Sequence, residues 1–140
     1  MIKKLCLTPF LLSVLFSLSI ANAMADTNDP IANSVPATTN VRAAEYPRIT
    51  PDDRVIFQIK APTAQSVAFD LGKVYPATKS ADGVWTVTTD PIPVGFHYYY
   101  LIIDGVRVSD PASQSFFGIG VNMSGIDIPE KDVDYYSAKN

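Results

Sequence analysis

The chain has 140 residues, of which 47% are hydrophobic and 18% are charged, and its formal net charge is −3. A mildly acidic chain without a basic cluster is unsuited to nucleic acid or an anionic membrane, so neither is expected as a partner. Its single cysteine, Cys6, lies near the N-terminus, so no disulfide is expected and a hydrophobic core must hold the fold together.

The first 25 residues have the organisation of a signal peptide. Lys3 and Lys4 precede an apolar run, and Ala21-Asn22-Ala23 then supplies the small residues that a signal peptidase recognises. The run of about 16 residues is shorter than the roughly 20 that a membrane span needs. We therefore expect a protein exported to the periplasm or secreted, with no membrane attachment after cleavage.

Residues 26–43 are rich in Asn, Thr, Ala and Pro without a sustained period, which predicts a flexible lead-in. The remainder is long enough for one small domain, expected over residues 44–129. Residues 130–140 are expected to be a tail or a truncated linker.

Short segments with strand periodicity and turn residues between them fill this domain. Alternation places Val55, Phe57 and Ile59 on one face of the first strand, and Pro76 marks an edge strand. Asp104-Gly105 is the strongest hairpin signal in the chain. Residues 116–122 are Gly-rich and expected to be irregular. The expected strands are 54–60, 66–71, 73–79, 84–88, 96–103, 106–108 and 125–128. About seven short strands with short connections predict an all-β, immunoglobulin-like antiparallel β-sandwich.

The longest expected strand carries three consecutive tyrosines, which alternation divides between two faces. Tyr98 and Tyr100 share one face with Phe96, whereas Tyr99 shares the other with His97. One of these faces must enter the core. The other can present aromatic rings to a ligand, because the apolar C–H faces of sugars stack on such rings.

Three stretches, VIFQIKAPTAQSVAFDLG, DGVWTVTTDPIPVGFHYYYLIIDG and SDPAS, together resemble one known module. It is the N-terminal early-set immunoglobulin-like module of bacterial feruloyl and related xylan esterases, which is akin to family-48 carbohydrate-binding modules. EYPRITPDDR and DPASQSFFGIG point to the esterase branch. The resemblance covers about residues 44–137 and implies an accessory module without its catalytic α/β-hydrolase domain.

No enzymatic, metal or cofactor site is expected. An esterase of this kind needs a nucleophile in a Gly-x-Ser-x-Gly elbow, and no serine of the chain has glycines at both positions. His97 is the only histidine, and it is expected to be an ordinary strand residue. Asp104 and Asp110 are accounted for by turns, in which aspartate bonds to its own backbone.

The resemblance implies that Tyr100 stands where glycogen-binding relatives contact their ligand, which puts Tyr98 and Tyr100 outward and Tyr99 inward. Both stacking tryptophans of those relatives are missing, which argues against starch or glycogen. Trp85 fits a packing position. Two roles remain open for the outward rings: contact with a xylan-type plant cell-wall polysaccharide, or docking of a hydrolase domain by a truncated esterase fragment. The candidate residues are Tyr98, Tyr100, Tyr75, Trp85, Phe116, Phe117 and Asn122.

Overall fold

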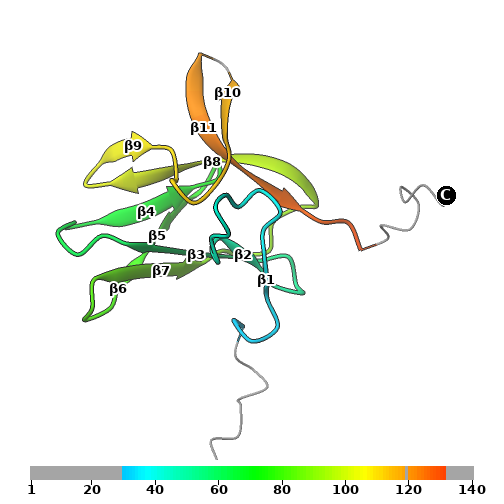
Figure 1. Ribbon diagram of the computed structural model, residues 1–140, viewed down its shortest axis with the longest axis horizontal. Helices are drawn as coiled ribbons and strands as arrows, with labels where there is room; N and C mark the ends of the chain where they lie inside the picture. The colour runs from blue at the N-terminus through cyan, green and yellow to red at the C-terminus, as the bar shows by residue number, and fades with distance from the viewer. Residues whose placement is uncertain (1–29, 119, 132–140) are drawn as a thin grey trace, which may run out of the picture.

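The computed structural model describes residues 30–118 and 120–131, and in this part the chain is all β (Figure 1). The strands are β1 (Val35–Pro36), β2 (Arg48–Ile49), β3 (Val55–Lys60), β4 (Val67–Asp70), β5 (Val74–Pro76), β6 (Thr78–Lys79), β7 (Val84–Thr88), β8 (Gly95–Ile103), β9 (Val106–Val108), β10 (Ser115–Gly118) and β11 (Val121–Ile128). They form two antiparallel sheets, with the orders β1-β2-β3-β7-β6 and β10-β11-β8-β4-β5, and β9 pairs with β8. The predicted antiparallel, immunoglobulin-like β-sandwich is therefore confirmed.

The aromatic core joins the two sheets. Phe57 of β3 stacks on Phe69 of β4, with ring centroids 4.3 Å apart, and lies 4.9 Å from the ring of Tyr99 in β8. All three side chains are almost fully buried. Because these residues occupy alternate positions in their strands, the period of two in the sequence predicted their burial.

The expected strand 73–79 is divided between the two sheets. β5 pairs with β4, whereas β6 pairs with β7 in the opposite sheet. The chain changes sheets at Pro76 and Ala77, where the proline has no backbone N–H for a continuous ladder. The sequence signal for an interrupted edge strand was right, but it did not show the change of sheet.

The described part of the lead-in differs from the flexible segment expected over residues 26–43. β1 pairs with β2, and Ala37 and Thr39 are buried. The Arg48 guanidinium donates to the Ser34 hydroxyl over 2.7 Å and to the Ser34 carbonyl over 2.5 Å. These long-range contacts fold the segment onto the domain. The composition of the segment does not predict them, because their partners lie elsewhere in the sequence.

Residues 116–118 and 121–122, from the segment expected to be irregular, instead lie in the β10–β11 hairpin, which extends beyond the rest of the sandwich (Figure 1). β11 is accordingly longer than the predicted strand 125–128. The predicted signal peptide and most of the predicted C-terminal tail lie outside the described residues. Within residues 30–118 and 120–131, no helix has the length and hydropathy of a membrane span.

Candidate functional site

The outer face of the six-stranded sheet carries two of the three tyrosines of β8. Tyr99 points inward and is 1% exposed, whereas Tyr98 is 47% exposed and Tyr100 is half-buried. The predicted division of the three rings is therefore confirmed. β8 pairs with β11 along its first half and with β4 along its second half, so residues from three strands meet on this face.

The second half of β8 carries a polar surface, here called the polar half: Tyr100, Arg107 and Asp70. The guanidinium carbon of Arg107 lies 5.1 Å from the centroid of the Tyr100 ring. An Arg107 nitrogen lies 2.9 Å from Asp70 Oδ2, and Asp70 Oδ1 accepts a hydrogen bond from the backbone N–H of Gly72. Both carboxylate oxygens of Asp70 are thus engaged, which holds the guanidinium over the tyrosine ring.

This arrangement suits a ligand that has both flat apolar surfaces and hydroxyl groups. The Arg107 side chain is 60% exposed, and a guanidinium has five N–H donors, so most of its donors face solvent. The Asp70 side chain is only 13% exposed, so the ion pair ties the exposed Arg107 guanidinium to a carboxylate that is itself held in place.

The first half of β8 carries an apolar surface, here called the ring cluster: Phe96, Tyr98 and Phe116. The rings meet edge to face, with centroids 5.1 Å apart for Phe96 and Tyr98, 5.0 Å for Phe96 and Phe116, and 6.1 Å for Tyr98 and Phe116. Edge-to-face contact is a favoured geometry for aromatic pairs. Three such contacts hold the rings in place although Phe96 and Tyr98 are largely exposed.

Gly125 forms the floor of the ring cluster. It pairs with Tyr98 across β11 and β8. A Cβ atom at this position would lie 2.5 Å from a ring atom of Phe116 and closer still to Phe96. A residue with a side chain at position 125 would displace the Phe96 and Phe116 rings, so the packing of the ring cluster requires glycine at this position.

Several candidates from the sequence do not belong to this face. Trp85 is 7% exposed, and its indole N–H donates to the Ala61 carbonyl over 2.9 Å, so it is a core residue and not a surface contact. Tyr75 pairs with buried Phe69 and therefore lies on the inner side of an edge strand. Phe117 pairs with Asn122, one position out of phase with Phe116, which places both on the opposite side of the hairpin.

Sequence reasoning missed Asp70 and Arg107 as parts of the site. Asp70 pairs with Tyr100, and Arg107 pairs with Ile102, the outward neighbour of Tyr100 on β8. Only the register of β4 and β9 against β8 brings them together. The hairpin signal at Asp104-Gly105 would have given the position of Arg107, because a two-residue turn sets the register.

A buried polar network lies behind the tyrosine strand. The Tyr99 hydroxyl donates to Asp110 Oδ2 over 2.9 Å, and the backbone N–H of Ala112 donates to Oδ1 over 2.8 Å. Burial raises the pKa of Asp110, although these two hydrogen bonds oppose the rise. Burial also raises the pKa of Tyr99, with a further contribution from the Asp110 charge. The network joins β8 to the turn before β10.

Both aspartates lie in turns as predicted, but only Asp110 bonds to the backbone of its own turn. Asp110 bonds to its own turn through the backbone of Ala112, as expected. Asp104 Oδ1 instead accepts from the backbone N–H groups of Gln65 and Ser66, both over 2.8 Å. It therefore joins the β8–β9 turn to the loop before β4.

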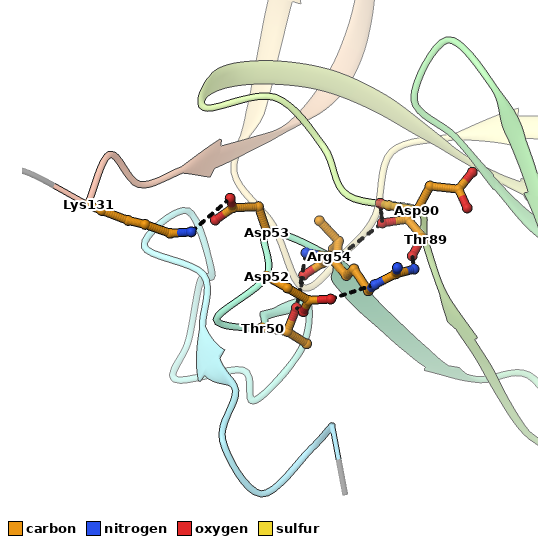
Figure 2. A network of polar contacts seen from close by, with 8 residues as sticks. Thr50, Asp52, Asp53, Arg54, Thr89, Asp90 and Lys131 are labelled. Carbon is orange, nitrogen blue, oxygen red and sulfur yellow. Dashed lines mark hydrogen bonds and ion pairs between the residues drawn. The ribbon is translucent and has the colours of Figure 1, made fainter. Parts of the chain in front are cut away.

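A second polar network stabilises the other end of the sandwich (Figure 2). Arg54 donates to Asp52 over 2.7 Å and to the Thr89 carbonyl over 3.1 Å, and Lys131 lies 3.4 Å from Asp53. Hydrogen bonds from Thr50, and then from Arg54, lower the pKa of Asp52. These contacts join loops and the end of the described chain, and no aromatic ring takes part, so we assign them a structural role.

The only histidine of the chain is engaged with backbone. His97 Nε2 lies 2.7 Å from the Pro93 carbonyl oxygen. Among the described residues, no group of three or more His, Cys, Asp or Glu side chains is arranged to hold a metal ion.

No protein-family model matches the chain. Over 121 residues it is 39% identical to an endo-1,4-beta-xylanase/feruloyl esterase of Xylanibacter ruminicola. The match covers 83% of this chain but 17% of that enzyme, so the chain spans about a sixth of its relative's length. The chain fits a module of that enzyme.

Among solved structures, a pullulanase from Paenibacillus barengoltzii matches with a TM-score of 0.40 and 19% identity, over 64% of this chain and 14% of that one. The similarity to the xylanase/feruloyl esterase and the all-β sandwich both fit an accessory, non-catalytic module of a multidomain carbohydrate-active enzyme.

Proposed function

We propose that this protein is a non-catalytic, carbohydrate-binding accessory module of the early-set, family-48-like type, which presents xylan-type plant cell-wall polysaccharide to a hydrolase. The observation that carries the proposal is the polar half beside the exposed Tyr98 ring. The similarity to a xylanase/feruloyl esterase supports xylan as the polysaccharide.

Binding would combine stacking with hydrogen bonds. Tyr98 offers a ring surface to the C–H face of a sugar. Arg107 covers one face of Tyr100 and offers free N–H donors to sugar hydroxyl groups, while Asp70 keeps it in place. Because an open sheet face buries little of its ligand, we expect weak binding that suits the presentation of a polymer.

The signal-peptide pattern at the N-terminus supports export, and an exported module would meet such a polysaccharide outside the cytoplasm. This part of the proposal is tested separately, by N-terminal sequencing of the protein recovered from the periplasm or medium. A new N-terminus after Ala23 or Ala25 is expected, and an intact Met1 in the cell fraction would contradict export.

Affinity electrophoresis with xylan, arabinoxylan and starch tests the binding. We expect retardation by the first two polymers and loss of it in Tyr100→Ala and Arg107→Ala. Phe117→Ala is the matched control, because Phe117 is 77% exposed on the other side of the hairpin. Unchanged mobility of the unmodified protein in all three gels would reject sugar binding and leave docking of a hydrolase domain as the role of this face.

A further inference from the structure

The ring cluster differs in chemistry from the polar half beside it. Its contacts are between aromatic rings, and the side chains that form it have one polar atom, the Tyr98 hydroxyl. Asp127, the cross-strand partner of Phe96, is exposed and supplies an acceptor at the rim. Tyr98 alone can stack on a sugar, but a sugar ring lying on Phe96 and Phe116 would need hydroxyl partners around its edge, so these two rings favour a flat apolar group with polar atoms at one end.

The cluster is organised before any ligand arrives. Phe96 and Phe116 settle on Gly125, and each ring contacts the other two. Met123, the cross-strand partner of Phe116, is 6% exposed, and both its terminal methyl and the Tyr98 ring lie close to Gly118. A guest ring would therefore meet aromatic edges and faces already in position, at little cost in side-chain entropy.

The two surfaces are continuous. Tyr98 and Tyr100 are two residues apart on the same side of β8, which separates them by about 7 Å along the strand. A polysaccharide chain lying on the polar half would thus bring its substituents within reach of the ring cluster.

We propose that the ring cluster binds the aromatic ring of a hydroxycinnamoyl ester, such as a feruloyl group, carried by the polysaccharide. The phenyl ring would extend the edge-to-face packing of Phe96, Tyr98 and Phe116, and its phenolic hydroxyl would face the rim at Asp127. The inference rests on the proposed function, because the polar half supplies the contact with the polymer. It adds that the module distinguishes decorated from bare xylan.

The test compares feruloylated arabinoxylan with the same polymer after mild alkaline removal of its esters, by isothermal titration calorimetry. An added aromatic contact of this kind should make binding of the feruloylated polymer about 3- to 10-fold tighter. Phe116→Leu, which keeps apolar volume but removes the ring, should abolish this preference and leave affinity for the bare polymer unchanged. Phe96→Leu is the second variant, and Phe117→Leu is the control that keeps the preference.

Methyl ferulate provides an independent readout. Saturable shifts of the Gly125 amide resonance on its addition are expected in the unmodified protein and not in Phe116→Leu. Equal affinity for both polymers, or no shift at Gly125, would overturn the inference while leaving polysaccharide binding intact. If neither polymer binds, the proposed function fails, and the methyl ferulate titration alone decides the inference. A cluster that takes no aromatic ligand is then a protein contact surface.

Discussion

Tyr99→Phe separates the contribution of the buried tyrosine ring from that of its hydroxyl group. The substitution keeps the ring against Phe57 and Phe69 but removes the hydroxyl that donates to Asp110 over 2.9 Å. Asp110 is 5% exposed, so solvent replaces the lost donor poorly. A hydrogen bond to a charged buried group contributes about 1.5–3 kcal/mol, which makes a loss of about 2 kcal/mol in the free energy of unfolding the expected result.

The measurement is urea denaturation followed by circular dichroism, with a thermal scan beside it. For a domain of this size, a loss of about 2 kcal/mol lowers the melting temperature by about 8–16 °C. The slope of unfolding free energy against urea should stay constant, because the surface exposed on unfolding does not change.

Tyr98→Phe is the matched control. It removes a hydroxyl from the neighbouring residue, which is 47% exposed, so its effect should stay within about 0.5 kcal/mol. A double-mutant cycle with Asp110→Ala should show that the two buried changes are not additive, since both remove the hydrogen bond between Tyr99 and Asp110. A Tyr99→Phe loss no larger than that of Tyr98→Phe would refute the reasoning.

Three further predictions concern stability and spectroscopy. Burial raises the pKa of Asp110 above its ordinary value of 3.8. The stabilisation that Asp110 gives the folded state is therefore complete below pH 3.8 and decreases as the pH rises through the raised pKa. The deficit of Asp110→Asn should therefore be larger at pH 4 than at pH 7 in urea titrations, and the reverse order would contradict this pKa direction. The fluorescence of Trp85, the only tryptophan of the chain, should resist acrylamide quenching and stay unchanged when polysaccharide binds, because Trp85 is buried in the other sheet. Arg48→Ala should lower the free energy of unfolding by about 1–2 kcal/mol by freeing the segment around Ser34, whereas a change within about 0.5 kcal/mol would show that this segment is loosely held.

Much of the sandwich was predictable because burial in β4 and β8 follows a period of two, although β3 buries three residues in succession. That period determined that Phe57 and Phe69 are buried and that Tyr99 faces away from Tyr98 and Tyr100. Turn chemistry was nearly as informative at Asp104-Gly105, where both residues have positive φ angles as the hairpin requires. These features are local, so the order of residues along the chain contains them.

The candidate site was only partly predictable, because it is made by pairing between strands. Phe116 meets Phe96 only through β11, and Gly125 matters only because two rings lie on it. Phe117 was a candidate together with Phe116, and Asn122 was a candidate through the resemblance, but a one-residue step along a strand moves a side chain to the other face.

By itself, the sequence determined the fold class, the burial of alternate residues and the placement of Tyr99 on the face opposite Tyr98 and Tyr100, since these depend on neighbours along the chain. The tertiary structure alone decided that Arg107 lies over Tyr100. It also decided that the lead-in around Ser34 is folded onto the domain. Those outcomes depend on strand register and on contacts between residues far apart in the chain, so no local sequence pattern predicts them.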